Sequence, residues 1–81
     1  MYSVIKHERL LRMKLEEYRR QLGWSQAELA RQAGISSPTV SKAESGESIN
    51  GRSAILICKA LGRALGTPVG IDEIEGWTVR V

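Results

Sequence analysis

The stretch from Gln26 to Ser45 constrains the fold more than any other part of this 81-residue chain. Ser25, just before it, is a residue type that caps the start of a helix. Gly34 stands where that helix must end in a left-handed turn, and Ser36 is placed to cap a second helix. The stretch therefore predicts two short helices, at about residues 26–33 and 37–45.

Small residues in this stretch allow the two predicted helices to cross closely. Ala30 lets the backbones approach, Gly34 makes the turn and Val40 fills the angle between the helices. This is a helix-turn-helix pattern. The outer face of the second helix carries Ser37, Pro38, Ser41, Lys42 and Ser45.

A further helix is expected before this pair, at about residues 7–22. Leu11, Leu15, Tyr18 and Leu22 recur there at three- and four-residue spacing, which gives one apolar stripe. Trp24 follows in an extended link and is expected to cover the edge of the core.

A fourth helix is expected after Asn50, which is a good N-cap, and before Thr67-Pro68, which ends it. Beyond it, residues 71–74 have the pattern of one helical turn. Trp77, Val79 and Val81 then alternate with polar residues, as in a strand. Such a strand would pair with Tyr2–Ile5 of its own or of a second chain, and the alternative is a flexible tail.

Charge is unevenly distributed along the chain, whose net charge is +3. Up to Val69 there are eleven Lys or Arg against six Asp or Glu, and from Gly70 onward one against three. The basic part is suited to face a polyanion and the acidic end is not. Such a balance supports nucleic-acid binding without establishing it.

Several classes of protein have little support in this sequence. The single His7 and the single Cys58 lack partners for catalysis, and Cys58 lies on an apolar helical stripe, so no enzyme activity is expected. No metal site or cofactor is expected either, since the ligands for one are missing. No apolar run is long enough to span a membrane and no signal peptide is evident, so a cytoplasmic protein is expected.

From Leu11 to Leu61 the chain resembles the Cro/phage-repressor (Xre-like) helix-turn-helix family. The most specific segments are LGWSQAELARQAGIS and VSKAESG. The resemblance implies an all-α fold class: a compact four- to five-helix, lambda-repressor-like domain, with or without a short β-strand pair from the chain ends. The whole chain, 1–81, would be one domain, with a core of about residues 8–66 and a tail of residues 67–81 for dimerisation or partner binding.

Carried over by position, the resemblance implies roles for individual residues. Gln26 would hydrogen-bond a DNA phosphate, and Arg52 would contact the DNA backbone or the minor groove. Arg19 and Glu44 would form a structural ion pair. The residues expected at the major groove, at base or phosphate, are Ser36, Ser37, Pro38, Thr39, Ser41 and Lys42. The chain departs from the family at Gly51, where proline is frequent, and in its longer segment after the fourth helix.

The expected function is sequence-specific DNA binding by a transcriptional regulator, a repressor. One recognition helix reads only a few base pairs, so a homodimer on a roughly palindromic operator is expected. One alternative is an antitoxin that binds a toxin protein and represses its own operon. Another is a protein-interaction domain without DNA contact.

Overall fold

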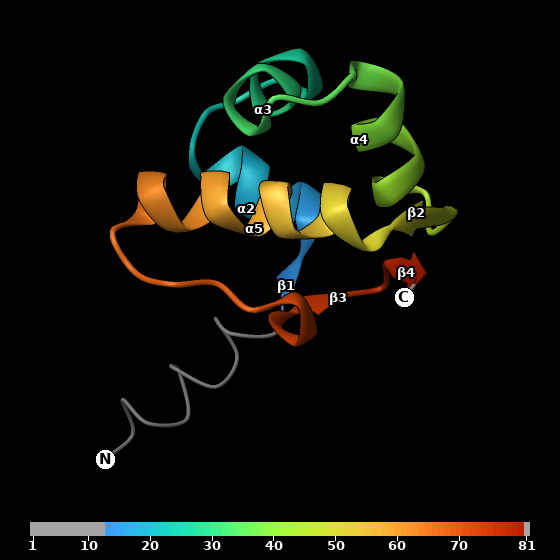
Figure 1. Cartoon of the computed structure of the whole chain (residues 1–81). Coiled ribbons are helices and arrows are strands. Elements are labelled where there is room, and N and C mark those ends of the chain that lie inside the picture. Colours follow the sequence, from blue (N-terminus) through green and yellow to red (C-terminus); the bar gives the residue numbers. More distant parts are fainter. Residues whose placement is uncertain (1–12, 81) are drawn as a thin grey trace.

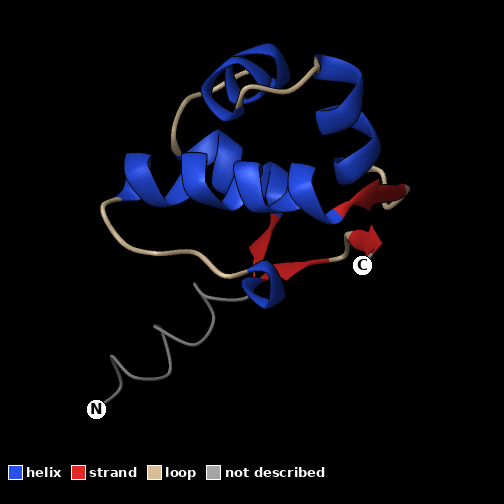
Figure 2. Cartoon of the chain, in the orientation of Figure 1, coloured by secondary structure: helices blue, strands red, loops and turns tan. Residues whose placement is uncertain are grey.

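The computed structural model describes residues 13–80, and within this range the chain forms four α-helices, one 3₁₀ turn and four short strands (Figure 2). The helices are α2 (Leu15–Gln21), α3 (Gln26–Ala33), α4 (Ser37–Glu44) and α5 (Gly51–Leu65), and the 3₁₀ turn is η1 (Ile71–Glu73). The strands are β1 (Met13–Lys14), β2 (Ser48–Asn50), β3 (Ile74–Glu75) and β4 (Thr78–Arg80). The expected fold class, a largely helical domain with short strands, is confirmed.

The helices begin where the sequence places capping residues. The side chain of Ser25 accepts a hydrogen bond from the backbone of Glu28 at the start of α3. Ser36 caps α4 and Asn50 caps α5 in the same way. Each cap satisfies a backbone N–H that has no partner inside its own helix. The three predicted starts are therefore confirmed.

The core lies between α5 and the other helices, and α3 lies above α5 in the view of Figure 1. Its largest fully buried side chains come from α2, α3, α4 and α5, and they are Leu15, Leu29, Val40, Ile57 and Leu61. Trp24 packs against this cluster and is half-buried, as expected. Burying apolar side chains of this size is the main force that holds short helices together.

The first helix is shorter than predicted. It begins at Leu15, because Met13 and Lys14 form a strand instead of a helical turn. The backbone N–H of Lys14 is bound by the Glu17 carboxylate at 2.8 Å, which marks the start of α2. The expected extension over residues 7–12 lies outside the described residues.

The tail folds back on the domain and pairs in parallel with two earlier segments. Strand β3 pairs with β1, and β4 pairs with β2 so that Asn50 lies opposite Arg80. Ile74 is buried, and the hydroxyl of Tyr18 donates to the Glu73 carbonyl at 3.2 Å. The predicted turn at residues 71–74 and the strand after Trp77 are both present. The expected partner segment, Tyr2–Ile5, lies outside the described residues.

Two glycines in α5 allow the tail to approach closely. A Cβ at Gly51 would lie 3.3 Å from the Arg80 carbonyl oxygen, and one at Gly62 would lie 3.2 Å from that of Thr67. The tail strand therefore occupies the space beside the start of α5. This contact gives a physical reason for glycine at position 51, where the family resemblance favours proline.

Candidate nucleic-acid interface

Helices α3 and α4 are joined by a tight turn at Gly34. Its φ of +76° lies in the left-handed region, and the backbone N–H of Ile35 bonds to the Ala30 carbonyl at 3.0 Å. Ala30 and Val40 are buried between the helices, as their predicted roles require. The two helices therefore cross closely with the outer side of α4 turned away from the core (Figure 1).

The outer side of α4 is polar and exposed. Thr39 is half-buried there, whereas the exposed residues are Ser36, Ser37, Pro38, Ser41 and Lys42. The hydroxyls of Ser36 and Thr39 lie 2.8 Å apart and hydrogen-bond to each other. This bond holds the first turn of α4 and ties up part of the hydrogen-bonding capacity of both side chains. Ser37, Ser41 and Lys42 therefore offer the more accessible polar groups of this face.

The far end of α4 is held by a network around the Glu44 carboxylate. Arg19 Nε donates to Glu44 Oε2 at 2.6 Å and Arg19 Nη2 donates to Oε1 at 3.1 Å. A third donor of the guanidinium bonds to the Trp24 carbonyl at 3.0 Å. The hydrogen bonds to Glu44 raise the pKa of Arg19 above its ordinary value, and this effect outweighs burial, which lowers the pKa by disfavouring the charged form. The network joins α2, the link at Trp24 and α4.

Gln26 belongs to the same network. Its Nε2 donates to Glu44 Oε1 at 2.9 Å, so the first residue of α3 is bound to the last residue of α4. An amide has a second N–H and a carbonyl oxygen, which leaves Gln26 with capacity for another partner. The sequence did not indicate this contact, since the two residues are 18 positions apart and meet only when the helices cross.

Arg52 is exposed in the first turn of α5, one residue after Gly51. Strand β2 connects the end of α4 to this turn and contacts both helices, so Arg52 follows α4 after one short strand. Arg63, at the other end of α5, donates to the Gln32 carbonyl at 2.9 Å and holds the end of α3. Side-chain hydrogen bonds from α2 and α3 thus hold the end of α4, and one from α5 holds α3.

The described part of the chain gives no support for a metal site or a membrane-spanning helix. No cluster of His, Cys, Asp and Glu there could hold a metal ion. No helix among residues 13–80 has the length and apolar character needed to cross a bilayer.

The fold and the exposed face of α4 define the class: a helix-turn-helix domain of the kind that binds DNA. A model of the helix-turn-helix family matches residues 15–67, which is more than half of the chain. The chain therefore belongs to the Xre-like helix-turn-helix family, and it is a DNA-binding transcription regulator. Comparison with curated proteins and with solved structures gave no match.

Proposed function

We propose that this protein is a sequence-specific repressor that binds a roughly palindromic operator as a homodimer, with α4 in the major groove. The observation that carries the proposal is the exposed polar face of α4, which stands on a buried helix crossing. The major groove is about 12 Å wide and admits an α-helix. Such a regulator acts on its operator in the cytoplasm.

In this arrangement residues of α4 read the bases, and residues of α3 and α5 position the protein on the duplex. Lys42 is the one long cation predicted on the face, and guanine O6 and N7 are its best base partners. Ser37 and Ser41 hydrogen-bond bases or phosphates with little selectivity, and Pro38 contacts a thymine methyl group. Gln26 and Arg52 bind phosphates and set the register of the protein on the duplex. Direct reading of bases is therefore modest, and DNA shape contributes to selectivity.

The contacts of the tail favour a standalone regulator over an antitoxin. A toxin-binding segment that orders only on its partner would have little reason to make specific contacts with its own domain. Here Ile74 is buried, and Arg80 Nη1 donates to the Ser48 hydroxyl at 3.2 Å. We infer that the described part of the tail, residues 67–80, belongs to the same unit as the helix-turn-helix.

The test is a DNA-binding titration of single variants on operators selected from random duplexes. Lys42→Ala should weaken binding by about 1–3 kcal/mol and relax the preference at one base pair. Arg52→Ala should weaken all sequences alike and lower the salt slope by about one unit. Arg20→Ala is the charge-matched control, since Arg20 pairs with Glu16 within α2. Equal binding by the wild type and the Lys42→Ala/Arg52→Ala variant would refute the assignment.

A further inference from the structure

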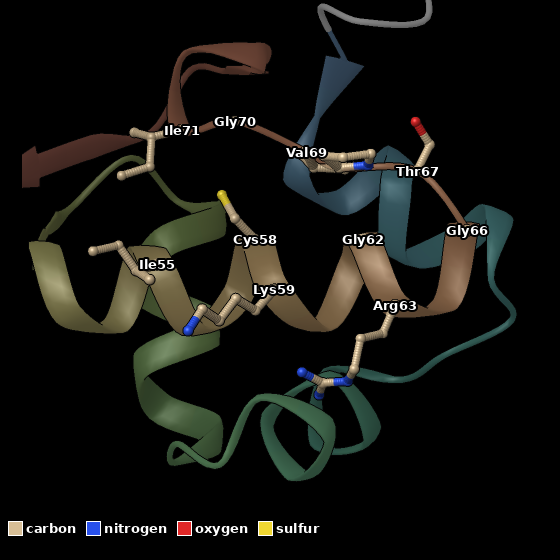
Figure 3. Close-up of a pocket in the computed structure, with 11 residues that line it drawn as sticks. Ile55, Cys58, Lys59, Gly62, Arg63, Gly66, Thr67, Val69, Gly70 and Ile71 are labelled. Atoms are coloured by element: carbon tan, nitrogen blue, oxygen red, sulfur yellow. The ribbon is translucent and has the colours of Figure 1, made fainter.

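The tail brings one arginine, Arg80, back to the segment that joins α4 to α5. From Gly66 to Ile71 the chain runs back along α5, with an open groove of about 660 Å³ between the two (Figure 3). Strand β4 then pairs with β2, which places Arg80 opposite Asn50. A residue of the tail therefore lies beside the start of α5, far in sequence from the helix-turn-helix but close to it in space.

The alternation of side chains along β4 turns Arg80 away from the core. Val79 packs against the core and lies opposite the buried Ile49, whereas Thr78 and Arg80 are exposed. Successive side chains of a strand point to opposite faces, so the Arg80 side chain leaves β4 on its outer face. It is therefore accessible to a partner outside the chain.

The guanidinium of Arg80 is anchored through one nitrogen only. Nη1 donates to the Ser48 carbonyl at 3.3 Å and to the Ser48 hydroxyl at 3.2 Å. Within residues 13–80, Nε and Nη2 have no hydrogen-bond partner and no carboxylate pairs with Arg80. These two nitrogens form the fork that binds a carboxylate or phosphate through two parallel hydrogen bonds.

Arg19 shows, in the same molecule, what a guanidinium held in this way binds. Its Nη1 is also anchored on a backbone carbonyl, that of Trp24 at 3.0 Å, and its Nε and Nη2 hold the two oxygens of the Glu44 carboxylate. Arg80 has the same carbonyl anchor on an exposed strand. A guanidinium fork matches phosphate as well as carboxylate, so an oxyanion is the partner that fits Arg80.

The surroundings of Arg80 are less acidic than the composition of the tail suggests. The acidic residues of the tail lie in η1 and β3, and they are Asp72, Glu73 and Glu75. Strand β3 pairs with β1, whereas Arg80 lies on the strand that pairs with β2. Glu47, just before β2, accepts a hydrogen bond from the Ser45 hydroxyl at 3.3 Å instead of pairing with Arg80.

We propose that Arg80 binds a phosphate of the DNA backbone beside α4, so that the tail is part of the DNA-binding surface. Ser48, which anchors Arg80, lies on the strand that contacts both α4 and the first turn of α5, where Arg52 is exposed. The matched family model ends at residue 67, so this contact is an addition to the common domain. The inference rests on the proposed function, because α4 in the major groove brings β2 and β4 to the flanking backbone.

The test is a titration of the full chain against random duplex and against a selected operator, at several salt concentrations. Arg80→Ala should weaken binding to both about tenfold at low salt and lower the salt slope by about one unit per bound chain. Base preference should stay the same, because a phosphate carries no sequence information. Arg80→Lys should keep the salt slope but recover only part of the affinity, since an ammonium group has no fork.

Two control variants accompany Arg80→Ala. Thr78→Ala changes the other exposed side chain of β4, and Arg20→Ala removes an equal charge that is paired with Glu16 in α2. Both should bind DNA as the wild type does. Equal binding by Arg80→Ala and Thr78→Ala would overturn the proposal.

Neutral operators separate a phosphate contact from an effect on folding. A single methylphosphonate removes the charge of one backbone position at a time. At the position that Arg80 binds, this change should weaken the wild type about tenfold and leave the affinity of Arg80→Ala unchanged. Equal losses by the two proteins at every position would assign Arg80 a structural role and overturn the proposal.

The contact of Arg80 and the proposed function can fail separately. If Lys42→Ala/Arg52→Ala weakens binding and Arg80→Ala does not, the assignment of α4 stands and the contact of Arg80 is refuted. If only Arg80→Ala weakens binding and the methylphosphonate effect depends on Arg80, the phosphate contact stands and the assignment of α4 is refuted.

Discussion

Replacing Glu44 by glutamine should remove a large part of the stability of this domain. The carboxylate receives two hydrogen bonds from Arg19 and one from Gln26, and the two charged side chains are only 12% and 8% exposed. Glutamine has nearly the same shape, but it leaves the guanidinium without its counter-charge in a place that water reaches poorly. The cost is therefore electrostatic rather than a loss of packing.

The magnitude follows from the burial of the pair. Removing one partner of a buried ion pair typically costs 3–5 kcal/mol, and we expect about 3 kcal/mol because Arg19 keeps some contact with water. A chain of this length has a total stability of about 4–12 kcal/mol. The melting temperature should accordingly fall by roughly 12–24 °C.

The measurement is thermal and urea unfolding of Glu44→Gln beside a matched control, Glu16→Gln. Glu16 pairs with Arg20 at the same 2.6 Å, but these side chains are 43% and 71% exposed. Exposed pairs contribute about 0–1 kcal/mol, so the control should be nearly neutral. Equal losses in the two variants would refute the reasoning. Replacing both Arg19 and Glu44 by apolar residues should cost less than Arg19→Met alone, because no unpaired charge remains.

Two further predictions concern the turn and the buried thiol. Gly34→Ala should lower the free energy of unfolding by about 1 kcal/mol in a urea titration, because its φ of +76° is unfavourable for a residue with a Cβ, and Gly34→Asn should cost less. Burial raises the pKa of Cys58 from 9.0 to about 11, so folding favours the neutral thiol. The protein should therefore lose stability as the pH rises from about 9 to 11, and this slope should be shallower in Cys58→Ala. An unchanged slope would contradict that cause.

The helix-turn-helix could be predicted from sequence because its determinants are local. Ser25, Gly34 and Ser36 act on backbone groups within a few residues, and Val40 fills a gap set by the turn itself. The placement of Arg19 and Glu44 came from the family resemblance, and the two side chains lie in contact. The roles of the α4 residues and of Arg52 toward DNA remain predictions, since they concern a partner outside the chain.

The errors and omissions lie where distant segments meet. The apolar stripe from Leu11 to Leu22 favoured one continuous helix, but Met13 and Lys14 pair with Ile74 and Glu75. Periodicity reports only which face of a segment is apolar, so it does not indicate a strand partner some sixty residues away. The bond between Gln26 and Glu44 was missed for the same reason.

The parallel pairing of β2 with β4 has a consequence for the order in which the chain folds. Its partners are about thirty residues apart, and long loops close at a higher entropic cost than short ones. The turn at Gly34 joins residues that are close in sequence, and local contacts generally form before distant ones. We therefore expect the crossing of α3 and α4 to be in place before β4 arrives beside it. This later step would then close the space beside Gly51 and set the final position of the first turn of α5.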